Sequence, residues 1–120
     1  ESTMAVAAPE EFPHALLSER LIAYALDGSA DATLLMRGWL RDSNKVPASE
    51  LERAINADGY AVRESLGAGN ALKVFALNTE LYPDSANAWD SLAECHAALG
   101  EKETADRLYA KAKALAKPSP

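Results

Sequence analysis

Residues in the second half of the chain recur 34 positions later, and this repeat constrains the fold more than any other feature. Ala71 and Phe75 are matched at that offset by Ala105 and Tyr109, so a small residue is twice followed by an aromatic one at i+4. Further pairs at the same offset are Ile55 with Trp89, Gly59 with Ala93 and Leu81 with Leu115. Such a period is typical of a repeated pair of antiparallel helices. Because these pairs bury their apolar faces against one another, the repeat predicts a curved stack with a groove, which favours binding over chemistry.

Turn residues divide the chain into six predicted helices. Apolar residues at helical spacing lie between the breaks, and no stretch has the strict alternation of a strand. The expected helices cover residues 13–26, 31–42, 49–66, 71–81, 87–99 and 102–116. The sequence therefore predicts an all-α fold, an α-α superhelix of about six antiparallel helices. Two repeat hairpins, 47–83 and 84–118, are expected to follow one irregular hairpin, 13–46.

Polar residues at the predicted breaks are expected to cap the helices. Asp31, Asn70 and Ser85 each precede a helical run, where a side-chain oxygen can accept from a free backbone N–H. Ser49 with Glu52 three residues on has the spacing of a capping box.

Length and charge limit the number of domains and the classes of partner. A chain of 120 residues suits one domain, here 13–120, with 1–12 as a linker or tag remnant, and Met4 inside the chain favours a fragment of a longer protein. The net charge of −6 argues against nucleic acid and anionic membrane surfaces as partners, since an acidic chain repels both. No apolar run approaches the roughly 20 residues of a membrane span. Cys95 is the single cysteine, so no internal disulfide can form.

The last two predicted hairpins resemble the tetratricopeptide repeat. That pattern reads Trp-x2-Leu-Gly-x2-Tyr, then Ala-x3-Phe, then Pro. The final unit matches it at Trp89, Leu92, Ala93, Ala105 and Tyr109, and the preceding unit at Ile55, Gly59, Ala71, Phe75 and Pro83. The preceding unit departs from it at Asp58, where the family prefers leucine, and at Asn78, where it prefers alanine. The resemblance implies a helical repeat fold with a protein-binding groove, and it leaves the ligand open.

A second resemblance concerns the run FALNTELYPDSANAWDSLAE, from Phe75 to Glu94. This run is similar to a segment in the C-terminal helical extensions of bacterial serine hydrolases, of the β-lactamase and penicillin-binding-protein group and of some esterases. The run ELERAINADGY, residues 50–60, also resembles part of that extension. The resemblance implies an accessory module joined to an N-terminal catalytic domain, in a periplasmic or secreted protein. Without it, a cytoplasmic location is expected.

Motifs for catalysis are missing from the sequence. Neither Gly-x-Ser-x-Gly nor Ser-x-x-Lys occurs, and the glycines around Ala68 follow no predicted strand and precede no Lys-Ser. His14 and His96 lack ligand partners at a suitable spacing, and Cys95 is expected to be a small buried residue. We therefore predict no catalytic residue, no metal and no cofactor for this chain, which is not expected to be an enzyme.

Several residues are assigned to the core or to structural contacts. Ala71, Phe75, Ala105 and Tyr109 are expected to be buried between helices, and Trp39, Trp89 and His96 are expected to pack. Asn78 shares a helix face with Ala71 and Phe75, so its amide must find partners. Two roles stay open for Asn78, a structural hydrogen bond to a neighbouring turn and a polar contact to a partner.

Candidate binding residues come from projecting the repeat onto the first helix of each hairpin, which lines the groove of such stacks. The residues so placed are Arg53, Asn56, Tyr60, Arg63, Asn87, Asp90 and Glu94. Amides and charges of this kind suit a peptide segment, with Tyr60 as the expected anchor because tyrosine offers a large contact area at low entropy cost. The expected partner is such a peptide or protein, or the N-terminal catalytic domain of the same polypeptide. A solvated surface without a ligand, and a homodimer in which the chain sets the oligomeric state, are the alternatives.

Overall fold

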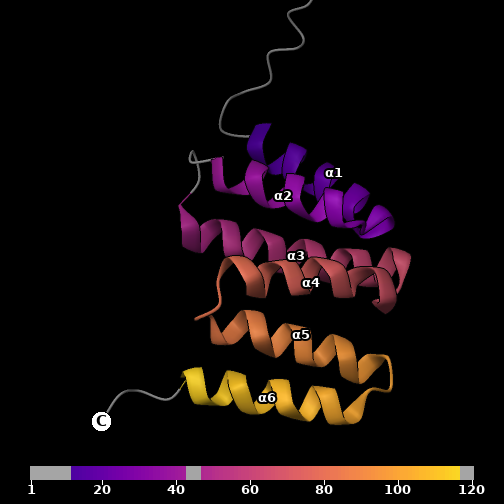
Figure 1. Cartoon of the computed structure of the whole chain (residues 1–120), viewed down its shortest axis with the longest axis vertical. Coiled ribbons are helices and arrows are strands. Elements are labelled where there is room, and N and C mark those ends of the chain that lie inside the picture. Colours follow the sequence, from indigo (N-terminus) through magenta and orange to yellow (C-terminus); the bar gives the residue numbers. More distant parts are fainter. Residues whose placement is uncertain (1–11, 43–46, 117–120) are drawn as a thin grey trace, which may run out of the picture.

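The computed structural model describes residues 12–42 and 47–116, and it confirms the predicted all-α fold (Figure 1). Its helices are α1 (Phe12–Asp27), α2 (Ala30–Asp42), α3 (Ala48–Leu66), α4 (Ala68–Leu81), α5 (Ala86–Ala98) and α6 (Lys102–Ala116). No strand occurs within the described ranges. Apart from Phe12, the predicted linker 1–12 lies outside the described residues, as do positions 43–46 and Pro118.

The last four helices form an open series of hairpins. α4 packs against α3, α5 packs against α4, and α6 packs against α5 (Figure 1). In the part of the chain that is described, α6 does not pack against α3 or α4. A closed bundle would bring α6 back to α3, so this arrangement excludes one for these four helices.

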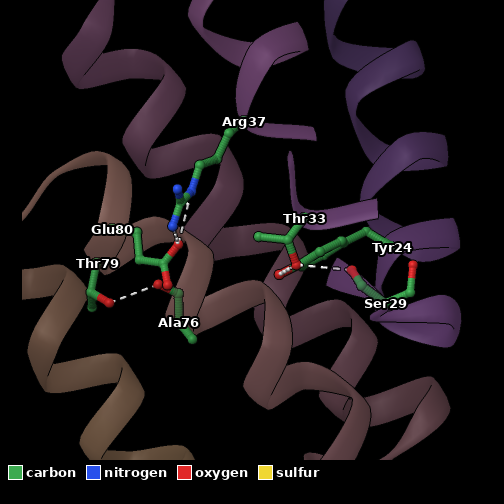
Figure 2. A network of polar contacts seen from close by, with 7 residues as sticks. All are labelled: Tyr24, Ser29, Thr33, Arg37, Ala76, Thr79 and Glu80. Carbon is green, nitrogen blue, oxygen red and sulfur yellow. Dashed lines mark hydrogen bonds and ion pairs between the residues drawn. The ribbon is translucent and has the colours of Figure 1, made fainter. Parts of the chain in front are cut away.

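The first hairpin attaches to this series in a different way. α1 packs across both α3 and α4, whereas α2 packs against α1 and α4. Leu17 and Leu21 of α1 enter the common core. Three polar contacts accompany this packing. Ser18 Oγ donates to Asp58 Oδ2 at 3.0 Å, and Lys73 Nζ donates to the carbonyl of Ala25 at 2.7 Å. The third is the ion pair of Arg37 on α2 with Glu80 on α4, which Figure 2 shows. Asp58, which departs from the repeat pattern, accepts this hydrogen bond from Ser18 of α1.

The repeat positions are buried in one hairpin and only partly in the other. Ala71 and Phe75 are fully buried and Ala105 is 1% exposed, as predicted. The prediction for Tyr109 is wrong, because this side chain is 37% exposed. Phe75 is covered because α5 packs on α4, whereas no described helix packs on the corresponding face of α6. A Cβ at Gly59 would lie 2.6 Å from the Phe75 ring, which explains the glycine.

Of the four predicted helix caps, the one at Ser85 is confirmed. Ser85 Oγ accepts from the N–H of Ala88 at 3.0 Å, as expected. Ser29 rather than Asp31 caps α2, by accepting from the N–H of Ala32 at 3.1 Å.

Two further caps differ from the prediction in α3 and α4. Glu52 makes no capping box with Ser49, since α3 begins after Pro47 without a side-chain cap and the Glu52 carboxylate instead receives the Ser85 hydroxyl. Asn70 lies inside α4, which begins after Gly67, and its amide donates to the carbonyl of Leu66 at 2.8 Å. The positive φ of +94° at Gly67 ends α3 and starts α4 with a single residue between them.

Candidate functional site

Tyr60 connects the two helices that carry the predicted groove residues. Its hydroxyl on α3 donates to the Glu94 carboxylate on α5 and lies 3.2 Å from Ser91 Oγ. Its ring meets Phe75 edge-on, with centroids 5.0 Å apart and an interplanar angle of 70°. Tyr60 is therefore half-buried and links α3, α4 and α5, so the expected anchor already has partners within the chain.

The other α3 residues of the predicted site differ in exposure. Arg53 is exposed, and Arg63 is half-buried. Asn56 is also half-buried, and its Oδ1 has no hydrogen-bond partner among the described residues. An amide oxygen without a donor carries a desolvation cost, which a partner N–H would remove.

The α5 residues of the predicted site, Asn87, Asp90 and Glu94, are all exposed. Asn87 and Asp90 line an open hollow of about 550 Å³ between α5 and α6. Its other lining residues are Ala86, Tyr109, Ala112, Lys113 and Ala116. Sequence reasoning missed Tyr109 and Lys113 as surface residues of this site. The 34-residue repeat places a residue within its unit but does not signal whether another helix covers it.

The carboxylates of Asp90 and Glu94 act on two tyrosines of this surface. Burial raises the pKa of Tyr60, and the Glu94 and Asp90 carboxylates raise it further. The pKa of Tyr109 is raised chiefly by desolvation and then by the same two carboxylates, with Arg63 opposing them. Tyr60, Asp90, Glu94 and Tyr109 therefore belong to one electrostatic neighbourhood that runs from α3 over α5 to α6.

Cys95 lies beneath this surface and has a packing role, as predicted. It is fully buried, and its thiol donates to the carbonyl of Ala68 at 3.2 Å. Burial raises the pKa of the thiol, so the neutral form is favoured and a thiolate nucleophile is not. The next residue, His96, is half-buried, and its Nδ1 lies 2.5 Å from Glu101 Oε1.

Asn78 makes a structural contact from the interior. It is fully buried, and its Nδ2 donates to the carbonyl of Glu52 at 3.2 Å. The hydrogen bond joins α4 to α3 and goes to a helix carbonyl rather than to a turn. Trp39 and Trp89 are both half-buried against the core, and Trp89 Nε1 donates to the carbonyl of Pro83 at 2.8 Å.

Within the described ranges no three His, Cys, Asp or Glu side chains lie where they could share a metal ion. No described helix is long and apolar enough to cross a membrane. Comparisons with protein-family models, with curated proteins and with solved structures gave no match. The side chains of the candidate site offer polar contacts, among them those of Tyr60 with Glu94 and Ser91.

Proposed function

We propose that this chain is a non-catalytic helical repeat module that binds a peptide segment or a folded domain through the surface shared by α3 and α5. The residues of this surface are Arg53, Asn56, Tyr60, Arg63, Asn87, Asp90 and Glu94. The observation that carries the proposal is the link from Tyr60 to Glu94, which sets polar side chains of two helices side by side above a closed core. Fixed polar groups on rigid helices bind with little loss of side-chain entropy.

Three further observations support binding at this surface. The helices form an open series rather than a bundle, so the surface continues from one hairpin to the next. Asn56 Oδ1 is an acceptor without a donor among the described residues. The similarity of residues 47–118 to tetratricopeptide repeats, and of residues 50–60 and 75–94 to serine hydrolase extensions, favours an accessory module beside a bacterial hydrolase domain.

The experiment uses a displayed peptide library selected on the immobilised chain, followed by fluorescence anisotropy of the selected peptides. Tyr60→Phe combined with Arg63→Ala is the test variant, because phenylalanine keeps the ring against Phe75 and removes only the hydroxyl. Truncating Tyr60 to alanine would also remove core packing. We expect the test variant to weaken binding about tenfold, the size of a typical interface hot spot.

Arg107→Ala is the matched control, since Arg107 is an exposed residue of α6 that the proposal does not use. Its binding should equal that of the wild type. Selected peptides that bind the test variant normally and lose affinity for the control would place the binding surface elsewhere.

A further inference from the structure

The 34-residue repeat relates the open hollow between α5 and α6 to a surface of the preceding hairpin that α5 covers in part. Moving each residue that lines the hollow back by 34 positions gives a set on the preceding hairpin. The set comprises Glu52, Arg53 and Asn56 of α3, Phe75, Asn78 and Thr79 of α4, and Tyr82 directly after α4. The two surfaces occupy equivalent places in successive units.

In the preceding hairpin this surface receives a helix. α5 packs on α4, and Ser85 at its start bonds to Glu52. Phe75 and Asn78 are fully buried as a result, and Thr79 is 4% exposed. In the last hairpin the equivalent of Phe75 is Tyr109, which is 37% exposed beside the hollow. The hollow therefore lies where α5 packs on the preceding hairpin, and one more α-helix could occupy it.

The covering helix in the first case shows which side chains fit such a seat. α5 buries Ala88, Ser91, Leu92 and Cys95, which are small or medium-sized residues at i, i+3, i+4 and i+7. α6 carries a comparable row toward the hollow, with Tyr109, Ala112 and Ala116. Alanines in such a row allow two helix backbones to approach closely, so α6 of another molecule meets the requirements of the seat.

The two walls of the hollow carry opposite charges, so the hollow of one molecule can pair with that of a second copy. Asp90 lies on its α5 wall and Lys113 on its α6 wall, and both side chains are exposed. If two copies are related by a two-fold axis, Lys113 of each molecule can pair with Asp90 of the other, and this contact occurs twice. In the antiparallel pairing, Tyr109 of one molecule covers Ala116 of the other, so a large side chain is set against a small one.

We propose that two copies of this chain associate through this face, with α6 of each copy seated in the hollow between α5 and α6 of the other. The hollow shares Asn87 and Asp90 with the surface proposed for peptide binding, whereas Tyr60 and Arg63 lie outside it, so the dimer would cover part of that surface. A contact of two short helices per molecule falls below the standard interface size, so we expect a weak dimer with a dissociation constant on the order of 100 µM.

Sedimentation equilibrium of the full chain tests the proposal over a concentration range that extends to about 1 mM. Lys113→Glu and Asp90→Lys should each weaken the dimer about tenfold, because each places like charges together twice. The double variant with both changes should dimerise within about threefold of the wild type, since the pair is restored with opposite polarity. Circular dichroism of each variant checks that the helices are retained.

A rival surface provides the control. Leu34 and Leu35 of α2 are 68% and 74% exposed, more than the other large apolar side chains of the described chain. Replacing both with glutamine should leave the dimer constant unchanged. A chain that stays monomeric throughout the range overturns the proposal, as does a dimer that survives the charge reversals and is lost in the leucine variant.

Discussion

The first hairpin, α1–α2, and the last hairpin, α5–α6, are held to the molecule by different kinds of contact. The last hairpin packs through small side chains, since Ala88, Ala93 and Cys95 are fully buried and Ala105 nearly so. The first hairpin combines apolar residues of α1 with polar contacts, among them the hydrogen bond from Lys73 to the carbonyl of Ala25. Its α2 leaves two leucines largely exposed.

This difference shows what the repeat provides. Where small residues recur at the same places, helices approach closely and side-chain hydrogen bonds are secondary. Where the pattern fails, as in α1 and α2, individual polar groups on α3 and α4 fix the position of the added helices. Asp58, which departs from the repeat, is one such group.

The largest effect should follow from overpacking the last hairpin. Ala105→Leu adds three carbon atoms at a site that is 1% exposed, and we expect it to destabilise the fold by roughly 1–3 kcal/mol. Ala110→Leu is the matched control on the same helix, where the alanine is exposed and the change should stay within about 0.5 kcal/mol. Urea unfolding followed by circular dichroism measures both. Equal stability of the two variants would show that α5 and α6 are not closely packed at Ala105.

A smaller and local effect should follow from removing a polar attachment of the first hairpin. Lys73→Met removes the ammonium that donates to Ala25 at the end of α1, at an expected cost of about 1–2 kcal/mol. Hydrogen exchange should speed up in α1 and α2 and stay unchanged in α6. Lys102→Met is the control, because Lys102 pairs with Asp106 on an exposed face of α6, where such pairs contribute little. Uniform loss of protection over all six helices would mean that the first hairpin does not open separately.

The sequence predicted the helices of the first and the last hairpin, but it predicted buried positions correctly only where the 34-residue repeat holds. Periodicity and breakers located six helices, and the 34-residue offset identified the buried positions Ala71, Phe75 and Ala105. Tyr109 was misplaced because the repeat describes a position within a unit, while burial also requires the next helix. The contacts of Asp58 and Lys73 join residues 40 and 48 positions apart, and no local pattern signals such pairs. Asn70 and Glu52 were misassigned as caps because the same polar groups found other partners in the folded chain.

Alkaline pH should affect the region around α3 to α5. The pKa values of Cys95, Tyr60 and Tyr82 are all raised, with burial as the first cause. A group whose folded pKa exceeds its unfolded value stabilises the fold fully below the unfolded pKa, and this stabilisation is lost as the pH rises. With unfolded values of 9.0 for the thiol and 10.0 for the phenols, stability should hold at neutral pH and decline from about pH 9.

Urea unfolding at a series of pH values, followed by tryptophan fluorescence, measures this decline. Cys95→Ala removes one of the three groups, so its stability should fall less steeply than that of the wild type near pH 9. Trp89→Phe leaves Trp39 as the reporter of the first hairpin, and Trp39→Phe leaves Trp89 as the reporter of the last. Stability that rises between pH 8 and pH 10 would contradict the direction of these shifts.

The smallest effect on stability should come from the outer face of the first hairpin. Leu34→Gln together with Leu35→Gln should change the free energy of unfolding by less than about 0.5 kcal/mol, because both side chains are already mostly in contact with water. Leu21→Gln is the contrast within the same hairpin, since Leu21 is fully buried and its replacement leaves an unpaired amide in the core. Thermal unfolding at low concentration measures the double variant and Leu21→Gln. A large loss for the α2 leucines would mean that another molecule or segment covers them in solution, and the first hairpin would then be as closely packed as the last.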